Sequence, residues 1–113
     1  MADEDVLGTH RQELRRGTVV LACLLVLRSP GYGYALLKTL DLAGIPSDGN
    51  TIYPLLRRLE ERGLLESEWN TDASRPRKFY RTNAAGIELA SQLMTEMSTL
   101  TASLETLNNG GTR

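Results

Sequence analysis

Apolar residues recur at intervals of three and four positions along four stretches of the chain, which is the spacing of amphipathic helices. These stretches are residues 9–28, 34–43, 50–62 and 83–107. Two shorter stretches, 64–69 and 78–82, alternate apolar and polar residues and include aromatic side chains, as strands do. Residues 70–77 between them have turn chemistry, so the strands should form an antiparallel hairpin. The pattern predicts a mainly α protein with a small two-stranded β hairpin.

The third predicted helix, residues 50–62, has the most sharply divided pattern. Its apolar stripe at i, i+3, i+4 and i+7 consists of Ile52, Leu55, Leu56 and Leu59. Asn50 or Thr51 can cap its start, Pro54 suits its first turn, and Gly63 supplies a left-handed stop. One face is therefore expected to pack against the protein, while the other is free to touch a partner.

The connector that leads into this helix is short and contains glycine and proline. Two helices joined by such a turn, the second one basic on its exposed side, are typical of a helix-turn-helix. The hairpin that follows takes the place of a wing. We therefore expect a flexible N-terminus over residues 1–8 and a winged helix-turn-helix domain over residues 9–82.

The last predicted helix, residues 83–107, is too long for the domain before it to cover. At the rise of an α-helix it would measure roughly 35 Å, so part of its apolar stripe would be exposed in a monomer. Pairing with the same helix of a second subunit would cover it, which predicts a homodimer. The residues expected to form this contact are Ile87, Ala90, Leu93, Met94, Met97, Leu100, Leu104 and Leu107. Residues 108–113 are expected to be a flexible tail.

Composition adds a constraint on nucleic-acid binding. The 113 residues suit a single domain, and their formal net charge of −1 gives no overall attraction to polyanions. Any such binding must come from a local basic surface. The wing has one, because Arg75, Arg77, Lys78 and Arg81 lie close together with no acidic residue among them.

Other classes of function are disfavoured. The single Cys23 lies in an apolar run, so a buried thiol is a better interpretation than a metal ligand. We find no clustered catalytic residues and no phosphate-binding glycine loop, so we expect no enzyme, no cofactor and no metal. The longest apolar run is shorter than the ~20 residues that span a bilayer, and no signal peptide precedes it. A cytoplasmic location without membrane contact is expected.

Local sequence segments resemble the PadR family of transcriptional regulators, in its short form with one C-terminal helix. The segments are LRRGT at 14–18, GYGY at 31–34, TIYPLLRRLE at 51–60 with GL at 63–64, and RPRKFYRT at 75–82. The combination of the third helix and a basic wing at this spacing is specific, and the resemblance covers about residues 14–86.

The resemblance implies a homodimeric repressor on an inverted-repeat DNA operator, with helix 50–62 in the major groove and wing 70–78 along the backbone. The residues support this mechanism independently, because arginine donates to phosphate or guanine, and tyrosine offers a hydroxyl or a ring. The predicted DNA-binding residues are Asn50, Thr51, Tyr53, Pro54, Arg57, Arg58, Arg75, Arg77 and Lys78.

Two questions stay open at this stage. A winged-helix module that binds a protein instead of DNA would use the same helices, and an apolar exposed face on the third helix would favour it. Some regulators of similar layout bind flat aromatic drugs between tryptophans of the dimer-forming helices, whereas helix 83–107 has no aromatic residue. Met94 and Met97 could still line a site for a small-molecule effector at the dimer interface. Trp69 is interpreted as a cross-strand packing residue of the wing.

Overall fold

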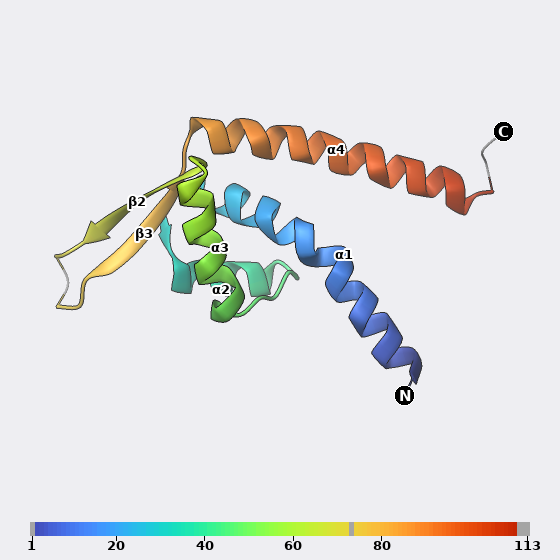
Figure 1. The fold of residues 1–113 in the computed structure, drawn as a ribbon, viewed down its shortest axis with the longest axis horizontal. Helices are drawn as coiled ribbons and strands as arrows, with labels where there is room; N and C mark the ends of the chain where they lie inside the picture. The colour runs from blue at the N-terminus through green and yellow to red at the C-terminus, as the bar shows by residue number, and fades with distance from the viewer. Residues whose placement is uncertain (1, 73, 111–113) are drawn as a thin grey trace.

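The computed structural model describes residues 2–72 and 74–110, with side chains from residue 5 onward. Residue 1 and residues 111–113, which belong to the two ends predicted to be flexible, lie outside this range. Four helices and three strands make up the described chain (Figure 1). In chain order they are α1 (Ala2–Val26), β1 (Gly31–Tyr32), α2 (Gly33–Leu42), α3 (Gly49–Glu61), β2 (Leu65–Asn70), β3 (Arg77–Thr82) and α4 (Ala84–Asn108).

The first helix is longer than the sequence pattern predicts. It begins at Ala2 instead of near residue 9, so residues 2–8, which were assigned to a flexible N-terminus, form the first turns of α1. No proline interrupts residues 2–26, and Gly17 does not break the helix. The exposed Val6, Leu7 and Leu14 extend the apolar side of the helix beyond the core. Apolar residues are few in this part of the helix, whereas the second half of α1 is strongly apolar. The sequence pattern therefore predicted the helix only from about residue 9 and missed its start.

The core lies where the second half of α1 packs against α2, α3 and the start of α4. Its members are Leu21, Ala22, Cys23, Leu24, Leu27, Leu36, Leu40, Ile52, Leu55, Leu56, Leu59, Leu65, Tyr80 and Ala90. The four residues of the predicted α3 stripe are all among them, so that prediction is confirmed. Burying this stripe fixes which side of α3 faces outward.

The sheet has three strands instead of the predicted two. The order is β1-β3-β2, and both pairings are antiparallel. In β1, Gly31 pairs with Tyr80 and Tyr32 with Phe79. Two residues are too few to show an alternating pattern, so this strand is set by tertiary pairing with β3 and not by its own sequence.

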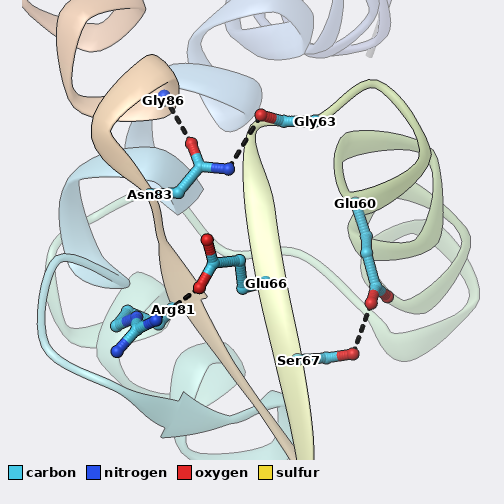
Figure 2. Close-up of polar contacts among 7 residues, drawn as sticks. All are labelled: Glu60, Gly63, Glu66, Ser67, Arg81, Asn83 and Gly86. Carbon is cyan, nitrogen blue, oxygen red and sulfur yellow. Dashed lines mark hydrogen bonds and ion pairs between the residues drawn. The ribbon is translucent and has the colours of Figure 1, made fainter.

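The start of α4 is tied to the end of α3 by one asparagine (Figure 2). The Asn83 side chain accepts a hydrogen bond from the Gly86 amide at 2.9 Å, which caps α4, and donates to the Gly63 carbonyl at 2.8 Å. Thr82 is buried and donates through its hydroxyl to the Leu24 carbonyl of α1 at 2.7 Å. These bonds set the direction in which α4 leaves the winged domain.

The wing and the free ends of the long helices lie at opposite ends of the molecule, which extends 60 × 37 × 22 Å (Figure 1). The hairpin of β2 and β3 projects at one end. At the other, the second half of α4 extends beyond the core, and the first half of α1 diverges from it. Residues 5–14 of α1 and residues 94–108 of α4 are solvent-exposed.

Candidate nucleic-acid interface

The start of α3 is capped by a residue that the sequence pattern did not select. Asp48 is the N-cap, and its side chain accepts a hydrogen bond from the Thr51 amide at 2.9 Å. The predicted caps, Asn50 and Thr51, are instead inside the helix, so that prediction was wrong. Because Ser, Asp, Asn and Thr all occur within 47–51, residue type alone could not locate the cap.

The position of the proline changes with the start of the helix. Pro54 is the sixth residue of α3 and lies beyond the first turn, where it removes the amide that would bond to the Asn50 carbonyl. This carbonyl therefore has no α-helical partner at residue 54. The expectation that Pro54 sits in the first turn is corrected accordingly.

Helix geometry divides the exposed side of α3 into three strips. With about 100° between successive residues, Asn50, Pro54, Arg57 and Glu61 lie opposite the buried stripe. Arg57 is exposed and forms no ion pair with any residue that the structure describes. The outward strip therefore presents a free guanidinium near the middle of the helix.

The two flanks of α3 face different neighbours. Tyr53 and Glu60 lie on the flank toward α2 and the wing, as their contacts with Gly33 and Ser67 show. Thr51 and Arg58 lie on the flank toward α1. There they line an open depression of about 530 Å³ together with Arg15 and Arg16.

The depression also changes the interpretation of the α1 arginines. The sequence alone favours a solvated face for Arg15 and Arg16 over a contact with phosphate. Arg16 does form an exposed pair with Glu13 at 3.2 Å, and exposed pairs of this kind contribute little to stability. Arg15, Arg16 and Arg58 nevertheless line one depression, together with the acidic Glu13 and Asp48. A spacing argument within a single helix could not reveal that α1 and α3 share this surface.

One carboxylate joins α3 to the wing. Glu60 accepts a hydrogen bond from the Ser67 hydroxyl of β2 (Figure 2), and its other oxygen lies 3.3 Å from the Lys78 ammonium of β3. The Glu60 and Lys78 side chains are each about one-third exposed. Lys78 also lies over the Tyr80 ring, 5.4 Å from its centroid. This lysine, predicted to bind DNA, is therefore already paired within the protein.

Tyr32 of β1 organises the base of the wing. Its hydroxyl accepts a hydrogen bond from the Asn70 side chain at 2.7 Å, and its ring packs edge-on against Phe79 at 5.8 Å. The Arg77 guanidinium lies over the same ring, 5.2 Å from its centroid, while its side chain stays exposed. This role of Tyr32 at the base of the wing was not predicted, because β1 itself was not predicted.

The outer wing carries the remaining groups. Arg75 is exposed next to the tip, and the Asp72 amide donates to the Asn70 side chain at 3.0 Å. The register pairs Trp69 with Lys78 across the hairpin, as a cross-strand residue should be, but Trp69 is 62 % exposed. Arg81 is paired with Glu66 on the neighbouring strand (Figure 2) and is less available than the other wing arginines.

Comparison with known proteins agrees with the winged-helix fold described above. Residues 20–92 match the transcriptional regulator PadR-like family. The chain belongs to this family. A PadR family transcriptional regulator from Eggerthella lenta is 44 % identical, with 98 % of this chain and 99 % of that chain covered and a TM-score of 0.94. No curated protein matches the sequence at a significant level.

Two further solved structures extend the likeness. A PadR-like transcription factor from Bacteroides fragilis is 26 % identical, with 88 % of this chain and 98 % of that chain covered and a TM-score of 0.73. A PadR-like regulator from Bacillus cereus, at 22 % identity, covers 88 % of this chain and 99 % of its own with a TM-score of 0.76. The family and fold of this chain are those of a DNA-binding transcriptional regulator.

The residues predicted for dimerisation of this PadR-like protein fall into two groups. Ala90 is 2 % exposed and belongs to the chain's own core, and Leu93 is partly buried against that core. The remaining residues are exposed on α4: Ile87, Met94, Met97, Leu100, Leu104 and Leu107. Val6, Leu7 and Leu14 of α1 are also exposed apolar residues. The predicted dimer contact did not include them, because it was drawn from helix 83–107 alone.

The single cysteine of the PadR-like chain is buried in the core, as predicted. Burial raises the pKa of the Cys23 thiol to about 12, because the charged thiolate would lose its hydration. Within the described residues, no group of three or more histidine, cysteine or carboxylate side chains is placed to hold a metal ion. None of the helices described is both long and apolar enough to cross a membrane.

Proposed function

We propose that this protein is a homodimeric transcriptional repressor that binds an inverted-repeat operator. In this proposal α3 of each subunit enters the major groove, and each wing lies along the phosphate backbone. The observation that carries it is the division of α3, whose apolar stripe is fully used by the core while Asn50, Pro54 and Arg57 face outward. A recognition helix presents its N-terminal residues to base edges. Asn50 and Pro54 lie in the first half of α3, and Arg57 follows about one turn later, near the middle of the helix.

The outward strip also separates the DNA proposal from a protein-binding module. The only large apolar side chain of α3 that is exposed in the described structure is Tyr53, at 40 %. A helix that docks into a protein groove would present several apolar anchors at helical spacing. The polar strip with a free arginine supports DNA as the partner.

The cations on this surface take different roles in the proposal. Arg57, opposite the core, is the candidate for bidentate contact with a guanine edge. Arg58 on the α1 flank, with Arg75 and Arg77 on the wing, would contact phosphates and set the orientation on the duplex. Lys78 would join them only if phosphate competes with Glu60 for its ammonium, because the two are 3.3 Å apart in the free protein.

Dimerisation is proposed through the exposed apolar faces of the long helices. The α4 residues from Met94 to Leu107 and the α1 residues Val6, Leu7 and Leu14 leave an apolar surface that a second copy would cover. The two recognition helices would then be related by a two-fold axis, as an inverted repeat requires. An effector at this interface would contact Met94 and Met97, whose flexible side chains adapt to different shapes.

The test begins with selection of bound duplexes from a random pool by the wild-type protein. Arg57→Ala should then weaken binding to the selected duplex by about 1–3 kcal/mol, with the dimer intact. Arg57→Lys is the matched variant, because it keeps the charge but lacks the planar fork. It should bind unrelated DNA like the wild type yet lose discrimination at one base position. A selected duplex bound equally well by the Arg57→Ala/Arg58→Ala double variant would refute the mechanism.

A further inference from the structure

The ring of Tyr53 on α3 lies between two glycines. A Cβ atom added at Gly33 would meet Tyr53 Cε1 at 2.4 Å, Cζ at 3.1 Å and Cδ1 at 3.2 Å. A Cβ atom added at Gly49 would meet the other edge of the ring, with Cε2 at 3.0 Å and Cδ2 at 3.2 Å. A Cβ atom at Gly33 would therefore collide with one edge of the ring, and a Cβ atom at Gly49 would press tightly against the other.

The two glycines come from different elements of the helix-turn-helix. Gly33 is the buried first residue of α2, and Gly49 is the first residue of α3, one turn before Tyr53. The ring thus connects the starts of both helices. Gly33 lies in a backbone region open to any residue, so conformational freedom does not explain why glycine stands there. The close approach of the Tyr53 ring explains the glycine at this position.

The phenol hydroxyl is left available by this packing. Tyr53 is 40 % exposed, and its hydroxyl makes no hydrogen bond to any residue that the structure describes. A ring held at both edges has little freedom to change rotamer, so the hydroxyl has a restricted set of positions before any partner arrives. Pre-organised groups lose less conformational entropy when they bind.

We propose that Gly33 and Gly49 are positioning residues that form a glycine slot for the Tyr53 ring and aim its hydroxyl at the DNA backbone. Through Gly49, the slot fixes the direction in which the Tyr53 side chain leaves α3. Through Gly33, it fixes the position of the ring relative to α2. This proposal rests on the proposed function, because it assigns the ring a place in the DNA complex. It adds to that function a requirement at two residues that do not touch DNA themselves.

The test compares Gly33→Ala, Tyr53→Ala and the double variant with a matched control. Gly31→Ala is that control, since a Cβ there has its nearest neighbour at 3.7 Å and the residue lies in the same glycine-tyrosine segment. Affinity is measured on the duplex selected by the wild-type protein. Gly33→Ala and Tyr53→Ala should each weaken binding about five- to tenfold, the equivalent of one lost hydrogen bond. The double variant should be no weaker than Tyr53→Ala alone, and the control should match the wild type.

A second measurement works without DNA. In NMR spectra of protein with isotope-labelled tyrosine, the Tyr53 ring resonances should shift in the Gly33→Ala variant and stay in place in the Gly31→Ala variant. If Gly33→Ala unfolds the protein, the slot predicts that adding Tyr53→Ala restores folding, because the colliding ring is then gone. Unfolding that persists without the ring would overturn the proposal.

The remaining outcomes separate the slot from the proposed function. A Gly33→Ala variant that binds the selected duplex like the wild type overturns the slot and leaves DNA recognition intact. Effects of Gly33→Ala and Tyr53→Ala that multiply in the double variant also overturn it, because independent residues add their free energies. A wild-type protein that selects no duplex refutes DNA binding itself, whatever the ring resonances show.

Discussion

Replacing Gly86 by alanine is predicted to destabilise the protein, although alanine is the better helix former. Gly86 is in the first turn of α4, and a Cβ there would lie 2.4 Å from the Leu64 carbonyl oxygen and 2.5 Å from Thr82 Cγ2. Neither atom can move freely. The Leu64 carbonyl accepts from the Asn83 amide at 3.2 Å, and Thr82 is held by its bond to the Leu24 carbonyl.

The sign of the effect follows from comparing three contributions. Helix propensity would favour alanine by up to about 1 kcal/mol. Overpacking against fixed atoms costs about 1–3 kcal/mol, and loss of a neighbouring hydrogen bond adds about 1 kcal/mol. We therefore expect a net loss of about 1–3 kcal/mol. Because Gly86 determines how closely α4 approaches the domain, the direction of α4 should also change.

Urea denaturation followed by circular dichroism measures this loss, at one protein concentration because dimerisation would make stability concentration-dependent. Gly17→Ala is the comparison, since this helical glycine of α1 has no atom within 4 Å of an added Cβ. It should stabilise the chain by about 1 kcal/mol. A Gly86→Ala variant as stable as the wild type would refute the close approach, whereas a destabilised Gly17→Ala would indicate that another subunit packs there.

Three other experiments test separate parts of the structure. Leu100→Glu together with Leu104→Glu should give a monomer that binds half-sites poorly, and a dimer mass by sedimentation would contradict the role given to α4. Glu60→Gln should release Lys78, strengthen DNA binding and steepen the slope of log K against log salt by about 0.9 per subunit; an unchanged slope would show that Lys78 does not reach phosphate. Cys23 should resist thiol reagents at pH 8 unless the protein unfolds, since its folded pKa is about 12. Because that pKa is raised above the ordinary 9.0, the neutral thiol of Cys23 contributes fully to the stability of the folded protein below pH 9. This contribution should be lost as the pH rises toward 12, and urea denaturation across this pH range would measure the loss.

The elements with strong periodicity were predictable from sequence. Ile52, Leu55, Leu56 and Leu59 are buried as the spacing required, because a single stripe on a short helix leaves one way to pack it. The basic hairpin was equally clear, since turn residues separate two β-rich segments. Composition and periodicity are local properties of the sequence. They were sufficient to predict the buried stripe of α3 and the basic hairpin.

What could not be predicted depends on contacts between distant segments. Strand β1 exists only because Gly31 and Tyr32 lie beside β3, and two residues carry no period of their own. Ala90 fitted the apolar stripe of α4 and was assigned to the dimer contact, but α1 and the domain cover it within the same chain. A stripe identifies which residues will be covered. It does not identify what covers them.

The two adjacent arginines of α3 show the same limit at the candidate site. In the sequence Arg57 and Arg58 are equivalent neighbours, and both were assigned to DNA. On the helix they point about 100° apart, so Arg57 faces outward, while Arg58 lines the depression toward α1 that Arg15 and Arg16 also line. If DNA approaches along the outward strip, Arg57 is the one of these two arginines that can reach base edges directly. Arg58 would meet the phosphates at the side of the groove. The Arg57→Lys change should therefore alter sequence preference, whereas Arg58→Lys should leave it unchanged.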